Sequence, residues 1–379
     1  MLSLPIEVEE IRKKARKFAL ENFKDDIAMK YDTEEKFPFE LWKKAFSEGL
    51  INFSNPWVML VTLEEFCRVD PSLGIATLIP TFGSEILMLF GNDEQKKKYL
   101  EPVLKGERIS GVAITEPVAG SDVAGIQTKL EKDQSGNWIL NGQKIFISNG
   151  TIADHLYVLA RSSQPPSFEK RHHGLTLVIV EKKMKGFSSS QLKGKLGVRA
   201  TNTAELRFEN VVIPPENIIG EIGKGFYYIM VFFNISRVYV ATQAIGLAQG
   251  VLDELLDYLV TAKKESNPIA DYESSLFLLA EIATRIEAAR SLTYKAADLV
   301  FKFTPDPILT SMAKYYASEV ANFAAEKSLE FIGNDAMISK LERFYRDAKI
   351  MEIWEGATEI EKLVISRMLI KNRMEKNEQ

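Results

Sequence analysis

The sequence predicts an α+β protein that is mainly α, with helical regions at both ends of the chain and a β region between them. Two changes in the pattern of apolar residues support this prediction. Apolar residues recur at the helical spacing over 1–110, short strand-like runs with turn signals occupy 111–221, and the helical spacing returns over 222–379. We therefore expect three domains with these bounds, which a chain of 379 residues is long enough to fold.

The first region contains several helical stretches. Val8, Ile11, Ala15 and Phe18 follow the helical period, and the runs 39–50, 58–68 and 72–90 continue it. Gly106 marks the end of this region, which we expect to form an N-terminal helical domain.

The middle region is typical of a small β-sandwich or barrel. Asn141-Gly142 lies between β-prone residues that extend from Trp138 to Ile145, which predicts a hairpin turn. The runs 156–161, 175–181 and 205–212 predict further strands.

The last region predicts a bundle of long helices. Asn267-Pro268 and the segment 304–307 break it into antiparallel pieces, and a third long helix is expected over 308–332. Thr358 is expected to cap the final helix, with Glu361 three residues later at the spacing of a capping box.

Composition excludes several classes of partner. The net charge is −4 and no long basic run occurs, which argues against nucleic acid and anionic membranes. The single cysteine, Cys67, cannot form an intrachain disulfide and indicates a reducing compartment such as the cytoplasm. Met1–Arg16 does not resemble a signal peptide, and the most apolar stretch, 226–233, is too short to cross a bilayer, so no membrane insertion is expected. Three histidines without ligand spacing predict no metal site.

Glu355 is the strongest candidate for a catalytic group. It lies in a Trp-Glu-Gly segment just before the last predicted helix. One interpretation is a surface carboxylate that favours the start of that helix. The alternative is a general base, because the apolar neighbours Ile350, Met351, Ile353 and Trp354 would desolvate the carboxyl group and raise its pKa. Gly356 would let another molecule approach the backbone.

Two segments of the middle region offer hydroxyl groups. Residues 114–122 form either an ordinary Pro/Gly turn or a loop that presents Thr115 and Ser121 to an electron-rich ring or a phosphate. Phe146 and Ser148, two residues apart on a predicted strand, share one face and would offer an aromatic cover and a hydroxyl group.

Arg237 lies early in a long predicted helix. It is either a surface residue or, since its neighbours in 230–240 are mostly apolar, a buried or ligand-bound guanidinium. Neither G-x-G-x-x-G after a strand nor G-x-x-x-x-G-K-[ST] occurs, which argues against a Rossmann dehydrogenase and a P-loop enzyme.

Five segments, in this order, resemble the acyl-CoA dehydrogenase family over nearly the whole chain. They are Thr115-Glu116-Pro117 with Ala119-Gly120-Ser121-Asp122, the stretch 141–150, Lys195-Leu196-Gly197-Val198-Arg199, Arg346-Asp347-Ala348 and Trp354-Glu355-Gly356. The resemblance implies an N-terminal helical domain, a β domain and a C-terminal four-helix bundle. It also implies one FAD in each subunit of a homotetramer or dimer, acyl-CoA as substrate and an electron-transfer flavoprotein as acceptor, as in fatty acid metabolism.

The resemblance also implies roles for particular residues. Glu355 matches the base that removes the α-proton, while the β-hydride goes to the flavin and gives a trans-2-enoyl-CoA. The flavin would contact residues of three segments: Ile114, Thr115, Ser121, Phe146, Ile147, Ser148, Ala357, Thr358 and Glu359. The CoA thioester would contact Ser121, Asn234, Arg237 and Gly356.

The sequence departs from the family pattern on the adenosine side of FAD. The usual arginine, phenylalanine and glycine after the first bundle helix are Ala262, Glu265 and Ser266, and a usual glutamine is Glu273. Residues 330–336 also lack the usual glutamine and two glycines. A flavin-poor structural partner subunit of a mixed oligomer therefore stays open as an alternative to the enzyme, as does an oxygen-using oxidase of the same fold.

Overall fold

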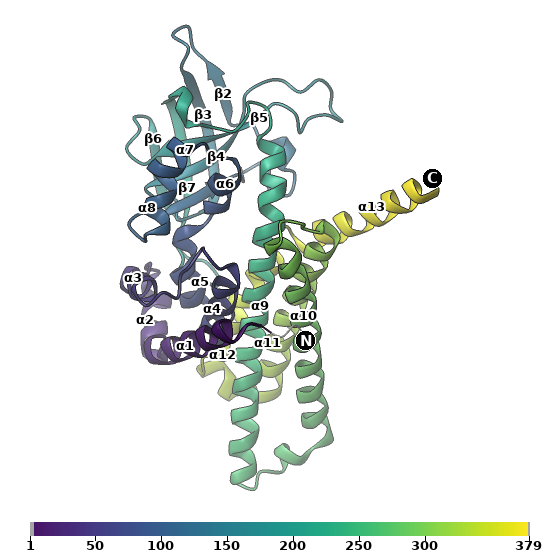
Figure 1. Cartoon of the computed structure of the whole chain (residues 1–379). Helices are drawn as coiled ribbons and strands as arrows, with labels where there is room; N and C mark the ends of the chain where they lie inside the picture. Colours follow the sequence, from purple (N-terminus) through teal and green to yellow (C-terminus); the bar gives the residue numbers. More distant parts are fainter. Residues whose placement is uncertain (1–3, 378–379) are drawn as a thin grey trace.

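The computed structural model describes residues 4–377 and shows a helical region, a β-sheet and a second helical region along the chain (Figure 1). The helices before the sheet are α1 Ile6–Asn22, α2 Asp25–Glu34, α3 Phe39–Ser47, α4 Pro56–Val69, α5 Pro71–Leu78, α6 Ser84–Phe90, α7 Asp93–Gln95 and α8 Glu101–Leu104, with single turns at η1 Ile79–Thr81 and η2 Lys96–Leu100. The fold class predicted from the sequence is confirmed.

Helix α4 and helix α5 form the buried centre of the N-terminal region because their ends are set by paired signals. Asn55 accepts a hydrogen bond from the amide of Trp57 and precedes Pro56, and Asp70 does the same for the amide of Leu73 before Pro71. A capping side chain followed by proline at the first helical position favours a sharp helix start.

All strands within residues 4–377 belong to one eight-stranded sheet. Its strands are β1 Ser110–Ala113, β2 Lys129–Lys132, β3 Trp138–Ser148, β4 His155–Arg161, β5 Leu175–Glu181, β6 Phe187–Gln191, β7 Thr203–Ile213 and β8 Ile218–Ile219. The order is β6-β7-β3-β2-β4-β5-β8, and β1 pairs in parallel with β4. Strands β4 and β5 are buried along almost their whole length, so the sheet is covered on both faces there.

The hairpin predicted at Asn141-Gly142 is wrong. Both residues lie inside the continuous strand β3, where the register against β7 shifts between Leu140 and Gly142. Gly142 has a φ of 147°, and a Cβ there would lie 2.7 Å from the Cα of Thr128, so the glycine serves a β-bulge and not a turn.

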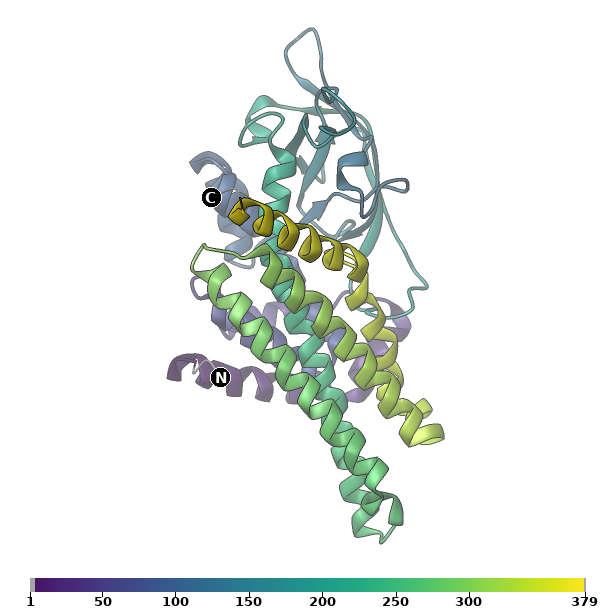
Figure 2. The ribbon, with the colours of Figure 1, turned by 90° about the vertical axis from the view of Figure 1, so that its right-hand side faces the viewer.

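The C-terminal region is built on three long helices that lie side by side (Figures 1 and 2). They are α9 Gly225–Lys264, α10 Glu273–Phe301 and α11 Pro307–Ile332, followed by the short helix α12 Leu341–Ala348 and by α13 Thr358–Asn377. The predicted breaks are confirmed, since Asn267 and Asp306 each accept backbone hydrogen bonds just before a proline turn or helix.

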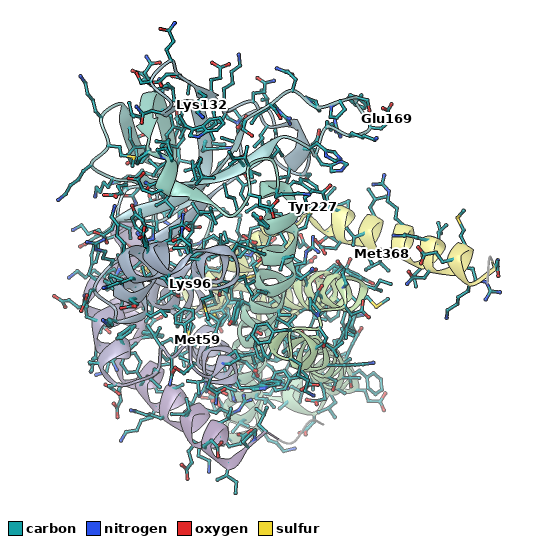
Figure 3. All side chains as sticks on the ribbon, turned by 45° about the horizontal axis from the view of Figure 1, so that its top comes forward. Met59, Lys96, Lys132, Glu169, Tyr227 and Met368 are labelled. Carbon is teal, nitrogen blue, oxygen red and sulfur yellow. The ribbon has the colours of Figure 1, made fainter. Side chains whose placement is uncertain are left out.

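Helix α13 is the fourth helix of this region and leaves the body of the chain. Figures 1 and 3 show this helix projecting from the rest of the structure. It packs on α11, and its buried residues are Thr358 and Glu361. The predicted capping box does not form. Thr358 is the first helical residue, its hydroxyl group has no partner within residues 4–377, and the carboxyl group of Glu361 lies 3.1 Å from Arg237 instead.

Within residues 4–377, two helical stretches are long and apolar enough to cross a membrane, whereas the sequence analysis took the most apolar stretch to be too short for this. They are Pro71–Phe90 and Gly225–Lys264. In the most apolar 18-residue segment of each, 67% and 61%, respectively, is buried inside the protein. Helices buried in the core of a protein can have the same length and apolar composition.

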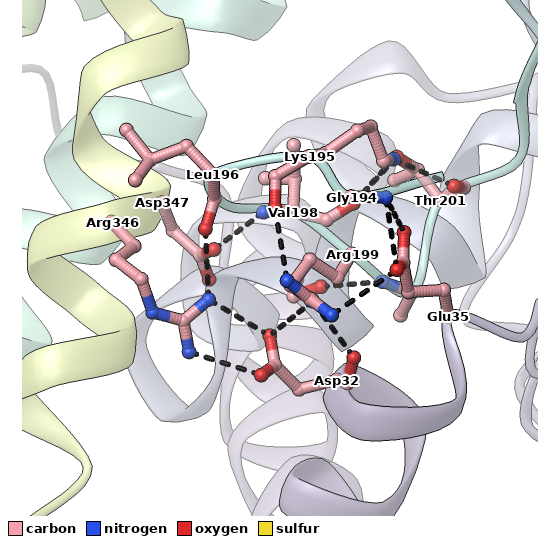
Figure 4. Close-up of polar contacts among 12 residues, drawn as sticks. Asp32, Glu35, Gly194, Lys195, Leu196, Val198, Arg199, Thr201, Arg346 and Asp347 are labelled. Atoms are coloured by element: carbon pink, nitrogen blue, oxygen red, sulfur yellow. Dashed lines mark hydrogen bonds and ion pairs between the residues drawn. The ribbon is translucent and has the colours of Figure 1, made fainter. Parts of the chain in front are cut away.

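Ion pairs join helix α2 to the loop after β6 and to α12 (Figure 4). Arg346 of α12 lies 3.0 Å from Asp32 of α2, and Arg199 of the loop lies 3.1 Å from Glu35 beside the same helix. Each pair connects segments that belong to different thirds of the chain.

The segments 195–199 and 346–348, which carry part of the family resemblance, contact each other directly (Figure 4). The amide of Val198 donates to Asp347 over 2.5 Å, and a Cβ on Gly197 would lie 2.4 Å from the carbonyl oxygen of Arg346. Only glycine allows this approach of two backbones, so these residues hold the domains together.

Candidate active site

The site is centred on Glu355, which lies between the 3-10 turn η7 Lys349–Glu352 and helix α13. Its φ of 54° and the φ of 115° at Gly356 place both residues in left-handed conformations. A Cβ on Gly356 would lie 1.9 Å from Oε1 of Glu361, so glycine is required here. This bend directs the side chain of Glu355 into an internal cavity.

Ser236 of α9 holds the carboxyl group of Glu355. Its hydroxyl group donates to Oε2 over 2.5 Å. Burial raises the pKa of Glu355, and the Ser236 hydrogen bond and the cations Arg237 and Lys314 oppose part of that rise. A carboxyl group with a raised pKa is a suitable general base.

Two buried cations support the backbone around Glu355. The guanidinium of Arg237 lies 3.1 Å from Glu361 and 3.5 Å from the carbonyl oxygen of Glu355. The ammonium group of Lys314 donates to the carbonyl oxygen of Gly356 over 2.5 Å, and burial lowers its pKa to about 8. Arg237 is therefore buried, as one of the two sequence interpretations proposed.

The cavity next to Glu355 is mostly apolar and contains about 730 Å³ of empty space, including its open mouth. Helix α9 contributes one face at helical spacing: Phe232, Ser236, Tyr239, Val240 and Gln243. Helices α4 and α5 contribute Met59, Leu63, Ile75 and Leu78. Trp354, Phe53, Ile79, Thr81, Phe82, Glu85 and Ser148 complete the lining. An apolar cavity lined by a carboxyl group fits an acyl chain.

The sheet brings Ser148 to this cavity together with Glu355. Near Ser148, β3 carries a second bulge, between Lys144 and Ile147, where Phe146 has a φ of 60° and leaves 66% of its surface exposed. Ile147 is buried in the core. The bulge turns the ring of Phe146 out of the sheet and leaves it free to cover a flat group.

The loop 114–122 is anchored by a charge that the sequence analysis did not single out. Glu116 accepts from the ammonium group of Lys144 over 2.8 Å and from the amides of Gln127 and Thr128. Burial raises the pKa of Glu116, but Lys144 and these amides outweigh it and lower the pKa overall. Lys144 also donates to the carbonyl oxygen of Ile114, which ties the loop to β3.

The remaining predicted site residues do not line the cavity. Thr115 is half-buried, and its carbonyl oxygen accepts from the amide of Ile145; Ser121 is exposed. Asn234 accepts from Thr310 over 3.3 Å. Ala357 and the exposed Glu359 flank the buried Thr358 at the start of α13.

Sequence reasoning missed four residues of the site. Ser236 belongs to no motif of the sequence analysis, and Glu361 was predicted to be a capping residue. Glu85 and Gln243 line the cavity but belong to no local pattern. The one available signal was the spacing of the α9 face, which places Gln243 two turns beyond Ser236.

The fold and this geometry define a protein in which a carboxylate from the last third of the chain meets an apolar cavity beside a β domain. Three family models match it in order: acyl-CoA dehydrogenase, N-terminal domain over 6–107, middle domain over 111–211 and C-terminal domain over 223–370. The chain belongs to the acyl-CoA dehydrogenase family.

Individual relatives cover nearly the whole chain. An acyl-CoA dehydrogenase of Bacillus subtilis is 35% identical over 373 residues, which are 95% of this chain and 97% of the relative. Subunit CarC of the caffeyl-CoA reductase-Etf complex of Acetobacterium woodii is 34% identical over 377 residues, with 95% and 97% covered.

Solved structures agree. Butyryl-CoA dehydrogenase of Megasphaera elsdenii superimposes with a TM-score of 0.90 at 30% identity, over 98% of this chain and 100% of the other. An acyl-CoA dehydrogenase of Bacillus anthracis complexed with FAD superimposes with a TM-score of 0.89 at 27% identity, over 98% of this chain and 68% of the other.

Proposed function

We propose that this chain is an FAD-dependent enzyme that removes two hydrogens from the α- and β-carbons of an acyl-CoA thioester and passes the electrons to an electron-transfer flavoprotein. The observation that carries the proposal is the carboxyl group of Glu355, which lines an apolar cavity, accepts from Ser236 and shares that cavity with Ser148. When bound, FAD accepts the hydride that leaves the β-carbon.

Glu355 performs the proton transfer. Oε2 is engaged by Ser236, so Oε1 is the oxygen that takes the α-proton. The α-carbon of a thioester is a weak acid, so it gives up its proton only to a sufficiently strong base. The raised pKa of Glu355 makes its carboxylate a stronger base and reduces the difference between the two pKa values. The same transfer in reverse returns the proton from Glu355 to the α-carbon.

Removal of the α-proton requires that charge on the thioester oxygen be stabilised. Within residues 4–377, the amide N–H of Glu355 donates to no protein acceptor, so it is free to donate to that oxygen. A fixed backbone donor in a site that excludes water stabilises the developing charge strongly. Arg237 and Lys314 hold this part of the backbone in place.

Two observations fit FAD. The exposed ring of Phe146 stands beside Ser148 and offers cover to a flat ring system. At the first turn of α13, Thr358 carries a buried hydroxyl group that has no partner among residues 4–377, and the first amides of a helix attract an anion such as a diphosphate. Ile114 and Thr115 lie on the loop that Lys144 and Ile145 of β3 hold, next to Phe146 along that strand.

The adenosine-side departures lie far from these groups within one subunit. Ala262 follows Arg237 by 25 residues along α9, which is about 37 Å at the helical rise. Residues at that end of α9 would serve the cofactor of another subunit, and we propose a homotetramer or dimer for this reason. Exposed apolar side chains at the α9–α10 end support an assembly, namely Val260, Tyr272, Leu276 and Phe277.

The partner and the cellular context are part of the same proposal. The relative from Acetobacterium woodii is a subunit of a complex whose name includes Etf, which supports an electron-transfer flavoprotein as the acceptor. A buried Cys67 as the single cysteine supports the cytoplasm. We place the reaction in fatty acid metabolism.

Flavin colour tests this proposal. Purified protein is expected to be yellow and to bleach without oxygen when an acyl-CoA is added, and an electron-transfer flavoprotein is expected to restore the colour. Colourless protein that does not take up added FAD would instead favour the flavin-poor partner subunit. Rapid recolouring by oxygen alone would favour the oxidase.

A further inference from the structure

Two side chains with hydrogen-bond acceptors, Glu85 and Gln243, line the acyl cavity in addition to Glu355. Glu85, at the start of α6, is half-buried and lines the cavity, so the uncovered part of its side chain faces the space that an acyl group would fill. Gln243, on α9, also lines the cavity, and its Oε1 is buried without a hydrogen-bond partner within residues 4–377.

The carboxyl group of Glu85 has no cation to balance it. Within residues 4–377 no lysine or arginine pairs with it. The charged group that affects its pKa is another carboxylate, Glu355. The backbone amides of Gly83 and Glu85 favour its ionised form. Burial raises the pKa of Glu85 to about 7. The hydroxyl group of Tyr157, which is also near Glu85, is already bonded to His155.

Position along α9 separates Gln243 from the reacting carbons. Gln243 lies seven residues beyond Ser236 on the same helix face, which is about 10 Å at the helical rise. Tyr239 lies between Ser236 and Gln243 on that face. Burial raises the pKa of its hydroxyl group, and the charge of Glu85 adds to that rise. Gln243 therefore faces the part of an acyl group that is remote from the thioester, and Glu85 lines the same cavity.

An unsubstituted alkyl chain does not suit these acceptors. It would remove water from both groups and return no hydrogen bond, which weakens binding. If the substrate were a plain alkyl chain, leucine or methionine would fill both positions without this penalty. An acid without a charge partner in a substrate cavity is typical of a recognition group.

We propose that the cavity recognises an acyl group that bears a hydrogen-bond donor, a hydroxyl or an ammonium group, on its remote part, and that Glu85 and Gln243 accept from this donor. The inference rests on the proposed function, because it assigns the substrate class of the same site. Glu85 and Gln243 are specificity-determining residues in this assignment and take no part in proton removal.

The test uses acyl-CoA thioesters from butanoyl to octanoyl. At each chain length it compares the unsubstituted thioester with its ω-hydroxylated and ω-aminated forms. The measured quantity is the ratio of kcat/KM for the donor-bearing thioester to that for the unsubstituted one, since a ratio within one variant cancels the amount of active enzyme. We expect a ratio of about ten or more for at least one chain length. A preference for the hydroxyl or for the ammonium arm identifies which donor the site takes.

Variants connect the preference to the two residues. Glu85→Leu and Gln243→Leu are each expected to lower the ratio by about tenfold, while Glu85→Gln, which keeps one acceptor oxygen, lowers it less. Glu94→Gln, an exposed glutamate on the neighbouring helix α7, is the control and is expected to keep the ratio of the parent. If one of the two leucine variants does not fold, the other still tests the inference.

Two results would overturn the inference: a ratio near or below one at every chain length, or a ratio that neither leucine variant changes. The proposed function fails separately, when no thioester bleaches the flavin. Titration calorimetry with the same thioesters then gives the ratio of dissociation constants without turnover, so the inference is decided in that case too.

Discussion

Ser236→Ala removes the hydroxyl group that holds the proposed base. In the folded chain this hydroxyl donates to Oε2 of Glu355 over 2.5 Å and favours the ionised carboxylate. Burial raises the pKa of Glu355, so the hydrogen bond opposes that rise. Its removal is expected to move the pKa of Glu355 further upward.

The size of the shift follows from the strength of the bond. A hydrogen bond to a charged group contributes about 1.5–3 kcal/mol. One pKa unit corresponds to about 1.4 kcal/mol, so the pKa of Glu355 should rise by about 1–2 units. Glu355 must be ionised to remove a proton, and a higher pKa means that ionisation needs a higher pH. The acidic limb of the pH profile of kcat/KM should therefore move to higher pH by about 1–2 units.

The assay is anaerobic flavin reduction by an acyl-CoA from pH 5 to pH 9, for the parent protein, Ser236→Ala and Ser236→Thr. The threonine variant keeps the hydroxyl group and is expected to keep the acidic limb of the parent. An acidic limb in Ser236→Ala at the same pH as in the parent would refute the assigned role of this hydrogen bond.

Three further variants test the support of the site. Gly356→Ala places a methyl group where Oε1 of Glu361 lies, at 1.9 Å, and should lower the free energy of unfolding by about 1–3 kcal/mol and abolish turnover; a stable, active variant in urea unfolding would contradict this. Glu361→Gln leaves Arg237 buried without its anion and should destabilise by about 3–5 kcal/mol, with part of the loss recovered in Glu361→Gln combined with Arg237→Met; an equal or larger loss in the double variant would argue against the pair. Thr358→Val removes a buried, unpartnered hydroxyl group, so it should weaken FAD binding by about fivefold while the melting temperature of the flavin-free protein stays equal or rises; unchanged flavin affinity would remove Thr358 from the cofactor site.

The parts of the fold that could be predicted are those set by local signals. The starts of α4, α5 and α11 coincide with an asparagine or aspartate followed by proline, and the long helices follow continuous apolar stripes. These preferences act within a few residues, so one sequence is enough to find them.

The hairpin error shows where local signals are ambiguous. Asn-Gly suits a tight turn because glycine accepts a positive φ, and a β-bulge uses the same property at Gly142. The turn itself lies between β2 and β3, where Asp133 accepts from the amides of Ser135 and Asn137. Pairing with the distant strand β7 decided between the two uses.

The proposed base, Glu355, could be predicted from the sequence, but the residues that hold it and complete the cavity could not. Glu355 stood out because an acid lies among apolar neighbours beside glycine. Glu361 has the spacing of a capping box, but a tertiary partner, Arg237, takes its carboxyl group. Glu85 and Gln243 meet only after α6 and α9 pack together, so no local pattern identifies them.

Exchange of the α-hydrogen of an acyl-CoA with solvent deuterium tests the central claim most directly, because it follows proton removal alone. The parent protein with bound FAD is expected to exchange this hydrogen without oxygen, and Glu355→Gln should keep the flavin but show neither exchange nor bleaching. Exchange at the parent rate in Glu355→Gln would contradict the assignment of Glu355 as the base.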